Sequence, residues 1–189
     1  ISISVIRQMN ARAKGSTINL GIGQLPYAAP SELLAEGKKA FDNGNTRYTA
    51  NAGMLALREA IAADHMERTG IFTTEDNVIV TNGAEGGVWN VMYTYLDADD
   101  EILIPEIGFS IYETIGKMQG ATVTTYKLKD DFSIDFVDLD SKISKKTKLV
   151  VFNSPNNPTG VTYTSNDVEK ISELLDEHSN LYCLSDEIY

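Results

Sequence analysis

Short runs of apolar and β-branched residues alternate along the chain with longer segments in which apolar positions recur at helical spacing. The short runs predict five strands, at residues 77–81, 101–105, 121–127, 148–153 and 181–185. The longer segments predict four helices, at residues 53–69, 84–96, 109–119 and 166–178. Strands that alternate with helices indicate a parallel sheet with crossover connections, so the predicted fold class is α/β.

Polar and glycine residues mark the ends of some of these elements. Gly70 follows the first predicted helix and is a suitable C-terminal stop, whereas Ser165 and Asn166 are candidate N-caps for the last one. Residues 19–30 are rich in glycine and proline, which predicts an irregular loop.

Composition and charge exclude several classes of binding partner and of protein. The chain has 189 residues, with 16 basic and 27 acidic side chains and a net charge of −11, which disfavours nucleic acid as a partner. No apolar run approaches the roughly 20 residues of a membrane helix, and the first residues do not resemble a secretory signal. The lone cysteine, Cys183, is expected to be buried in a strand and fits a reducing, cytoplasmic location. His65 and His178 have no ligand pattern around them, so no metal site is expected.

Motifs that could carry chemistry follow three of the predicted strands. Residues 81–86 (TNGAEG) open a helix, where free backbone N–H groups and the helix dipole can bind a phosphate. Residues 153–160 (NSPNNPTG) contain two prolines and a glycine, which predict a fixed loop directly after a strand. Residues 185–189 (SDEIY) place a carboxylate where it could pair with a protonated ring nitrogen. Taken singly, each motif could also be an ordinary turn or helix cap.

Together with residues 48–62 (YTANAGMLALREAIA) and 105–112 (PEIGFSIY), these motifs resemble the class I and II aminotransferases, which are pyridoxal-phosphate enzymes of fold type I. The resemblance covers nearly the whole chain, and GFSIY is similar to the tyrosine-aminotransferase-like branch. It implies a three-layer αβα fold with a mostly parallel sheet. Residues 1–47 would form an N-terminal arm and part of the small domain, and residues 48–189 the first part of the large, cofactor-binding domain.

The resemblance implies a set of residues that bind pyridoxal 5′-phosphate. Ala84 and Glu85 match the residues whose backbone amides hold the phosphate, provided that the Glu85 side chain points away. Phe109 matches the aromatic residue that stacks on the pyridine ring, although it could also be a core aromatic. Tyr112, one turn later, is expected to pack in the core.

The resemblance implies that the cofactor ring also contacts residues of the last two motifs, at its nitrogen and its phenolic oxygen. Asp186 matches the carboxylate that pairs with the ring nitrogen. Asn157 and Tyr189 match the residues that hydrogen-bond the phenolic oxygen. A capping aspartate and a packing tyrosine are the alternative interpretation of Asp186 and Tyr189.

Two residues near the N-terminus are implied to complete the site. Tyr48 resembles the tyrosine that reaches the phosphate in the neighbouring subunit, which implies a homodimer with active sites at the interface. Gly23 resembles the backbone position that approaches the substrate carboxylate. The chain continues with Gln24 and Leu25 where the family often has Glu-Pro-Asp, so the substrate is left open. A surface tyrosine and a plain linker are the alternatives.

The resemblance implies transamination between an amino acid and a 2-oxo acid. A pyridoxal-phosphate-dependent carbon-sulfur lyase and a non-catalytic module that binds the cofactor are the alternatives, and Tyr189 favours the aminotransferase over the lyase. No lysine here matches the family's cofactor-bearing lysine, and the sequence ends directly after the SDEIY motif. We therefore expect a fragment of a longer protein, with no catalytic lysine and no activity by itself.

Overall fold

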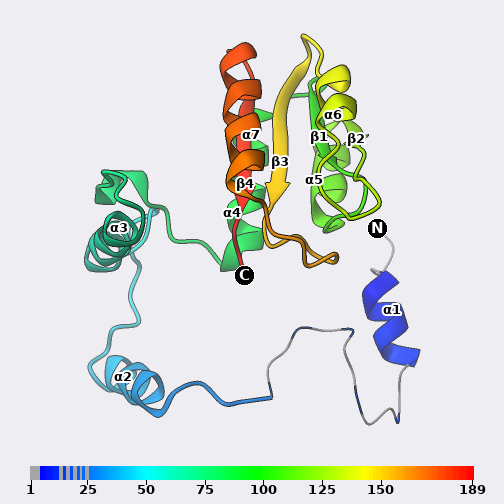
Figure 1. Ribbon diagram of the computed structural model, residues 1–189. Helices are drawn as coiled ribbons and strands as arrows, with labels where there is room; N and C mark the ends of the chain where they lie inside the picture. The colour runs from blue at the N-terminus through cyan, green and yellow to red at the C-terminus, as the bar shows by residue number, and fades with distance from the viewer. Residues whose placement is uncertain (1–4, 13–14, 16–17, 19–20, 22, 24–25) are drawn as a thin grey trace. The chain divides into compact units, whose positions relative to one another are not determined.

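The computed structural model describes residues 5–12, 15, 18, 21, 23 and 26–189. The chain divides into two compact units, Ile1–Thr49 and Ala50–Tyr189. The first unit contains helices α1 (Val5–Arg12) and α2 (Ser31–Asp42), which Figure 1 draws in blue. Within the loop predicted at residues 19–30, positions 19–20, 22 and 24–25 lie outside the described residues.

The second unit is built on a four-stranded parallel sheet with the order β2-β1-β3-β4. The strands are β1 (Glu101–Pro105), β2 (Thr122–Tyr126), β3 (Thr147–Asn153) and β4 (Tyr182–Asp186). The register pairs Asn153 at the end of β3 with Asp186 at the end of β4. Because all four strands are parallel, their carboxyl ends lie at one edge of the sheet, and the predicted α/β class is confirmed.

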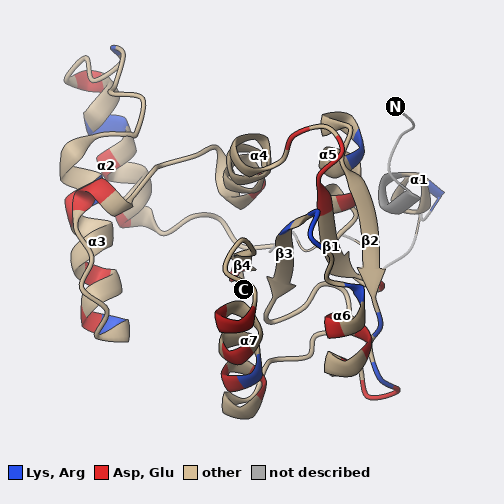
Figure 2. Cartoon of the chain, turned by 90° about the horizontal axis from the view of Figure 1, so that it is seen from above, with Lys and Arg blue, Asp and Glu red and all other residues tan. Residues whose placement is uncertain are grey.

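Helices cover both faces of this sheet, as Figure 2 shows from above. Helices α4 (Gly83–Tyr95) and α5 (Ile111–Gln119) pack on one face, and α6 (Phe136–Lys142) and α7 (Ser165–Glu177) on the other. Successive side chains of a strand point to opposite faces of the sheet. Ile102 and Ile104 therefore pack with residues of α4 and α5, whereas Leu103 between them packs with residues of α6 and α7. The predicted three-layer αβα arrangement is therefore confirmed.

The segment before α4 differs from the prediction. Helix α3 (Leu55–Thr69) ends at Gly70 in the left-handed conformation, as predicted, and is followed by the short 3-10 helix η1 (Glu75–Asn77). The Arg58 side chain ties the two together by donating hydrogen bonds of 2.8 and 3.0 Å to the Glu75 carbonyl. The strand predicted at residues 77–81 is wrong: Val78 has extended angles, but no described segment pairs with this stretch as a strand. A strand needs a hydrogen-bonding partner, which a local sequence pattern does not reveal.

Three smaller expectations also need correction. Helix α7 is capped by Thr164, one residue before the expected Ser165, in a capping box in which the Thr164 hydroxyl accepts from the Asp167 N–H. Cys183 is exposed in β4, where a buried position was expected. The short helix α6 was not predicted, although Asp135 caps it by accepting from two backbone N–H groups.

No described helix is long and apolar enough to cross a membrane.

Candidate active site

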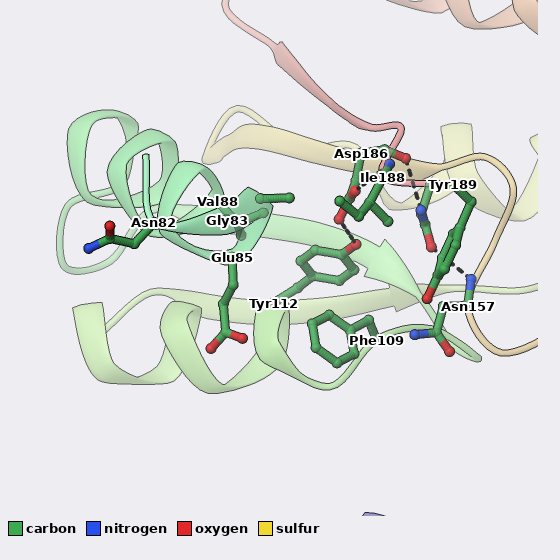
Figure 3. Close-up of a pocket in the computed structure, with 12 residues that line it drawn as sticks. Asn82, Gly83, Glu85, Val88, Phe109, Tyr112, Asn157, Asp186, Ile188 and Tyr189 are labelled. Carbon is green, nitrogen blue, oxygen red and sulfur yellow. Dashed lines mark hydrogen bonds between the residues drawn. The ribbon is translucent and has the colours of Figure 1, made fainter. Parts of the chain in front are cut away.

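A cavity of about 360 Å³ lies where the carboxyl ends of β1, β3 and β4 meet the N-terminus of α4. Parallel sheets commonly place their ligand sites at this edge. Six residues singled out from the sequence line it together, although they lie on four separate segments (Figure 3). They are Ala84, Glu85, Phe109, Asn157, Asp186 and Tyr189.

The first turn of α4 forms one side of the cavity. Its N-cap residue, Asn82, makes no side-chain capping hydrogen bond, and the Thr81 hydroxyl donates to the Gly83 carbonyl instead of accepting from the helix. The first-turn N–H groups of an α-helix have no acceptor within the helix, so those of Ala84 and Glu85 remain available to an anion. The Glu85 side chain extends away from Asp186 in Figure 3.

Asp186 lies at the end of β4 and is held by two hydrogen bonds. The Tyr112 hydroxyl donates to its Oδ2 atom at 2.6 Å, and the Ile188 N–H donates to its Oδ1 atom at 3.3 Å. No Lys or Arg is among the described residues that line the cavity, so the carboxylate has no cationic partner there. A partly buried carboxylate without such a partner is suited to a ligand that brings its own positive charge.

Tyr112 packs in the core as expected, but it also reaches the site. The residue is buried, and burial raises its pKa well above the usual range, with the hydrogen bond and charge of Asp186 acting in the same direction. The phenol therefore stays protonated and donates to Asp186 at any physiological pH. The sequence pattern could not reveal this contact, because the two residues are 74 positions apart.

Phe109 lies just before α5 and is partly buried against the core cluster. Its ring meets the Tyr112 ring edge to face, with 6.1 Å between centroids and an interplanar angle of 87°. Figure 3 draws the Phe109 ring beside Tyr112 within the cavity. The arrangement fixes the orientation of an aromatic surface that a flat heterocycle could cover.

The loop after β3 carries Asn157 and is anchored by two buried asparagines. Asn156 donates to the Ile107 carbonyl at 3.1 Å and to the Thr159 hydroxyl at 2.8 Å. Asn153 accepts from the Asn157 N–H at 2.8 Å and donates to the Asp186 carbonyl at 2.8 Å. Asn153 also lines the cavity, although it was not among the site residues predicted from the sequence. An asparagine that ends an otherwise apolar strand was the signal that could have found it.

The remaining predicted site residues are placed differently. Tyr189 lines the cavity and is 70% exposed, on the side where Figure 3 also draws Asn157. Tyr48 and Gly23 belong to the first unit and are exposed, and the cavity is formed by residues of the second unit. Their roles stay predictions.

His178 has acidic neighbours that the sequence did not indicate. Its Nε2 atom lies 3.5 Å from the Asp140 Oδ1 atom, and one ligand atom each from Asp140, Glu177 and His178 lie within 4.8 Å of one another. The group joins the C-terminal ends of α6 and α7, and none of its members lines the cavity. Such exposed acidic groups are common on protein surfaces.

Known proteins share the sequence pattern and the fold of this chain. The family model for aminotransferase class I and II matches residues 16–189. The chain is 35% identical over 189 residues to a probable aspartate aminotransferase of Methanocaldococcus jannaschii and 33% identical over 195 residues to an aromatic-amino-acid aminotransferase of Thermococcus litoralis. Each alignment covers 100% of this chain and 50% of the relative. The chain thus spans about half the length of the curated relatives it matches.

Solved structures give the same result. The aspartate aminotransferase of Thermus thermophilus with maleate superposes with a TM-score of 0.92 at 29% identity, over 100% of this chain and 51% of that one. YbdL of Escherichia coli, described with a methionine aminotransferase function, superposes with a TM-score of 0.93 at 25% identity, over 100% and 50%. Since the family model covers most of the sequence and the fold agrees, the chain belongs to the class I and II aminotransferase family.

Proposed function

We propose that the protein of which this chain is part is a pyridoxal-phosphate-dependent aminotransferase that moves an amino group between an amino acid and a 2-oxo acid. One observation carries the proposal: a single cavity combines the uncapped N-terminus of α4 with the cation-free carboxylate of Asp186. A phosphate needs the first feature and a protonated pyridine nitrogen needs the second. Few ligands other than pyridoxal phosphate have both groups at the two ends of one ring.

The residues of the cavity fit each part of this cofactor. The N–H groups of Ala84 and Glu85 would bind the phosphate, and Asp186 would pair with the ring nitrogen. Phe109 would lie against the ring face, and Asn157 and Tyr189 would hydrogen-bond the phenolic oxygen. When bound, pyridoxal phosphate supplies an electron sink that stabilises the carbanion formed at the α-carbon of an amino acid.

Each residue then has a defined task. Asp186 keeps the ring nitrogen protonated, which strengthens the withdrawal of electrons, and the protonated Tyr112 holds the carboxylate in place through its 2.6 Å hydrogen bond. Phe109 excludes water from one face of the ring and fixes its plane. No lysine of this chain matches the family's cofactor-bearing lysine, so the 189 residues alone are expected to bind the cofactor weakly and to have no turnover.

The assembly and the substrates are part of the same proposal. We propose a cytoplasmic homodimer in which Tyr48 reaches the partner's phosphate and Gly23 approaches the substrate carboxylate. Residues 1–47 would then belong to the arm and small domain, and residues 48–189 to the large domain. Relatives carry names for aspartate and for aromatic amino acids, which makes aspartate with 2-oxoglutarate the first pair to assay.

The Asp186→Ala substitution in the natural gene product tests this function. We expect turnover to fall by at least a hundredfold, because the ring nitrogen loses its carboxylate, while the protein still takes up cofactor through α4. Glu187→Gln is the matched control, since Glu187 is the adjacent carboxylate, is exposed and does not line the cavity. Equal turnover in Asp186→Ala and Glu187→Gln would refute the assignment.

A further inference from the structure

Asn153 is the last residue of β3 and is only 1% exposed. Every polar group of its side chain has a partner. The Nδ2 atom donates to the Asp186 carbonyl oxygen at 2.8 Å, and the Oδ1 atom accepts from the Asn157 N–H at 2.8 Å. The Asn153 backbone N–H donates to the Tyr163 hydroxyl at 3.3 Å, which fixes the residue from the other face of the sheet.

A carboxamide at this depth is costly unless its hydrogen bonds are satisfied, so its partners indicate what it does. Both partners are backbone groups of residues whose side chains face the cavity. One belongs to the loop after β3 and the other to the end of β4, and these segments are separated by helix α7 in the sequence. Asn153 therefore links the two segments through a single rigid side chain.

The link joins two groups with complementary tasks. Under the proposed function, Asp186 contacts the nitrogen of the cofactor ring and Asn157 contacts the phenolic oxygen. The two contacts must be spaced to match a ring of fixed size, and hydrogen-bond strength falls steeply with misplacement.

We propose that Asn153 is a positioning residue for the cofactor ring, setting the spacing between Asn157 and Asp186 through its two side-chain hydrogen bonds. This inference rests on the proposed function. It makes Asn153 a determinant of ring recognition and leaves phosphate recognition to the first turn of α4, whereas the side-chain hydrogen bonds of Asn153 go to Asn157 and Asp186.

A purely structural role would have a different consequence. Thr147 at the other end of β3 is a buried polar residue of the same kind: it is 3% exposed, its hydroxyl donates to Glu101 at 2.6 Å and it accepts from the Ser144 N–H at 2.8 Å. It does not line the cavity. Replacement of Thr147 by Val therefore lowers stability through the same strand without a direct effect on the site.

The experiment compares Asn153→Ala, Asn153→Asp and Thr147→Val in the natural gene product after removal of the cofactor. Pyridoxamine 5′-phosphate is the probe, because its amine does not react with surface lysines, and inorganic phosphate is the second ligand. Isothermal titration gives the Kd of each ligand, and thermal melting gives the change in stability. Asn153→Asp keeps the shape of the side chain and the acceptor for the Asn157 N–H but loses the donor to the Asp186 carbonyl. It therefore replaces Asn153→Ala in the comparison if the alanine variant does not fold.

We expect Asn153→Ala to raise the Kd for pyridoxamine phosphate about tenfold or more, because the loss of one or two hydrogen bonds that position the site corresponds to a change of that size. The Kd for inorganic phosphate should stay within about twofold, and Asn153→Asp should fall between wild type and Asn153→Ala. Thr147→Val, at a comparable loss of melting temperature, should leave both values unchanged.

The inference is overturned if both ligands weaken equally, or if Thr147→Val weakens pyridoxamine phosphate as much as the Asn153 variants do. A wild-type protein that binds inorganic phosphate but no pyridoxamine phosphate would refute the proposed function itself, and the inference with it.

Discussion

The Tyr112→Phe substitution isolates one hydrogen bond between the core and the site. It removes a single hydroxyl, which donates from α5 to the Asp186 carboxylate at 2.6 Å, and it keeps the ring that is 1% exposed in the core. A hydrogen bond to a charged group contributes about 1.5–3 kcal/mol. Asp186 is only partly buried, so water replaces some of the loss, and we expect unfolding to become easier by about 1.5–2 kcal/mol.

Equilibrium urea unfolding of the chain at pH 8, followed by circular dichroism, measures this change. Tyr93→Phe is the control, because Tyr93 is 71% exposed and its hydroxyl is in water, so the free energy of unfolding should change by less than about 0.5 kcal/mol. A double-mutant cycle of Tyr112→Phe with Asp186→Ala should give a coupling energy above about 1 kcal/mol, because the two side chains are in direct contact. A Tyr112→Phe variant as stable as Tyr93→Phe, with no coupling, would refute the reasoning.

Two further predictions concern stability. Gly53→Ala should lower the free energy of unfolding by about 2 kcal/mol, because the residue has φ of +103° and an added Cβ would lie 2.7 Å from Val80. Gly70→Ala is the control: with φ of +73° and open space around the residue, it should lower the free energy of unfolding by only about 1 kcal/mol. Equal losses in the two variants, measured by urea unfolding, would show that the clash is absent. Burial raises the pKa of Tyr126. The free energy of unfolding should therefore keep the contribution of the neutral phenol below about pH 10, which is the pKa of an unfolded tyrosine, and should fall above it by up to about 1.4 kcal/mol per pH unit. Urea unfolding between pH 8 and 11 should give a smaller alkaline slope for Tyr126→Phe than for wild type, and an unchanged slope would contradict the assignment.

The sequence predicted most of the second unit because the relevant signals are local. The predicted span of β1 is identical to the observed one, and the other three strands differ by one residue at their ends. Gly70 ended its helix as predicted, since a left-handed C-terminal residue favours glycine for local steric reasons. Six predicted site residues line one cavity. Phe109, Asn157, Asp186 and Tyr189 do so because they end or follow β1, β3 and β4, whose carboxyl ends meet at one edge of the sheet. Ala84 and Glu85 belong to the first turn of α4 and follow no strand of the sheet.

The failures concern contacts between distant parts of the chain. Residues 77–81 have a strand pattern, yet pairing depends on a neighbour that no window of sequence contains. Cys183 alternates like a core residue, yet it is exposed, because burial depends on what packs over the strand and not on the pattern within it. Tyr112 and Asn153 were identified as core and motif residues, and only the folded structure placed them against Asp186.

By itself, therefore, the sequence determined the α/β class, the family motifs and the candidate residues, since helical period, strand alternation and turn chemistry are properties of short segments. The tertiary structure alone decided how these residues are held: which carboxylate lacks a cation, which phenol donates to it, and which asparagine links the two segments that face the ring. Those features depend on hydrogen bonds between residues 33 to 74 positions apart, such as Asn153 to Asp186 and Tyr112 to Asp186, and such bonds exist only once the sheet has aligned the ends of its strands.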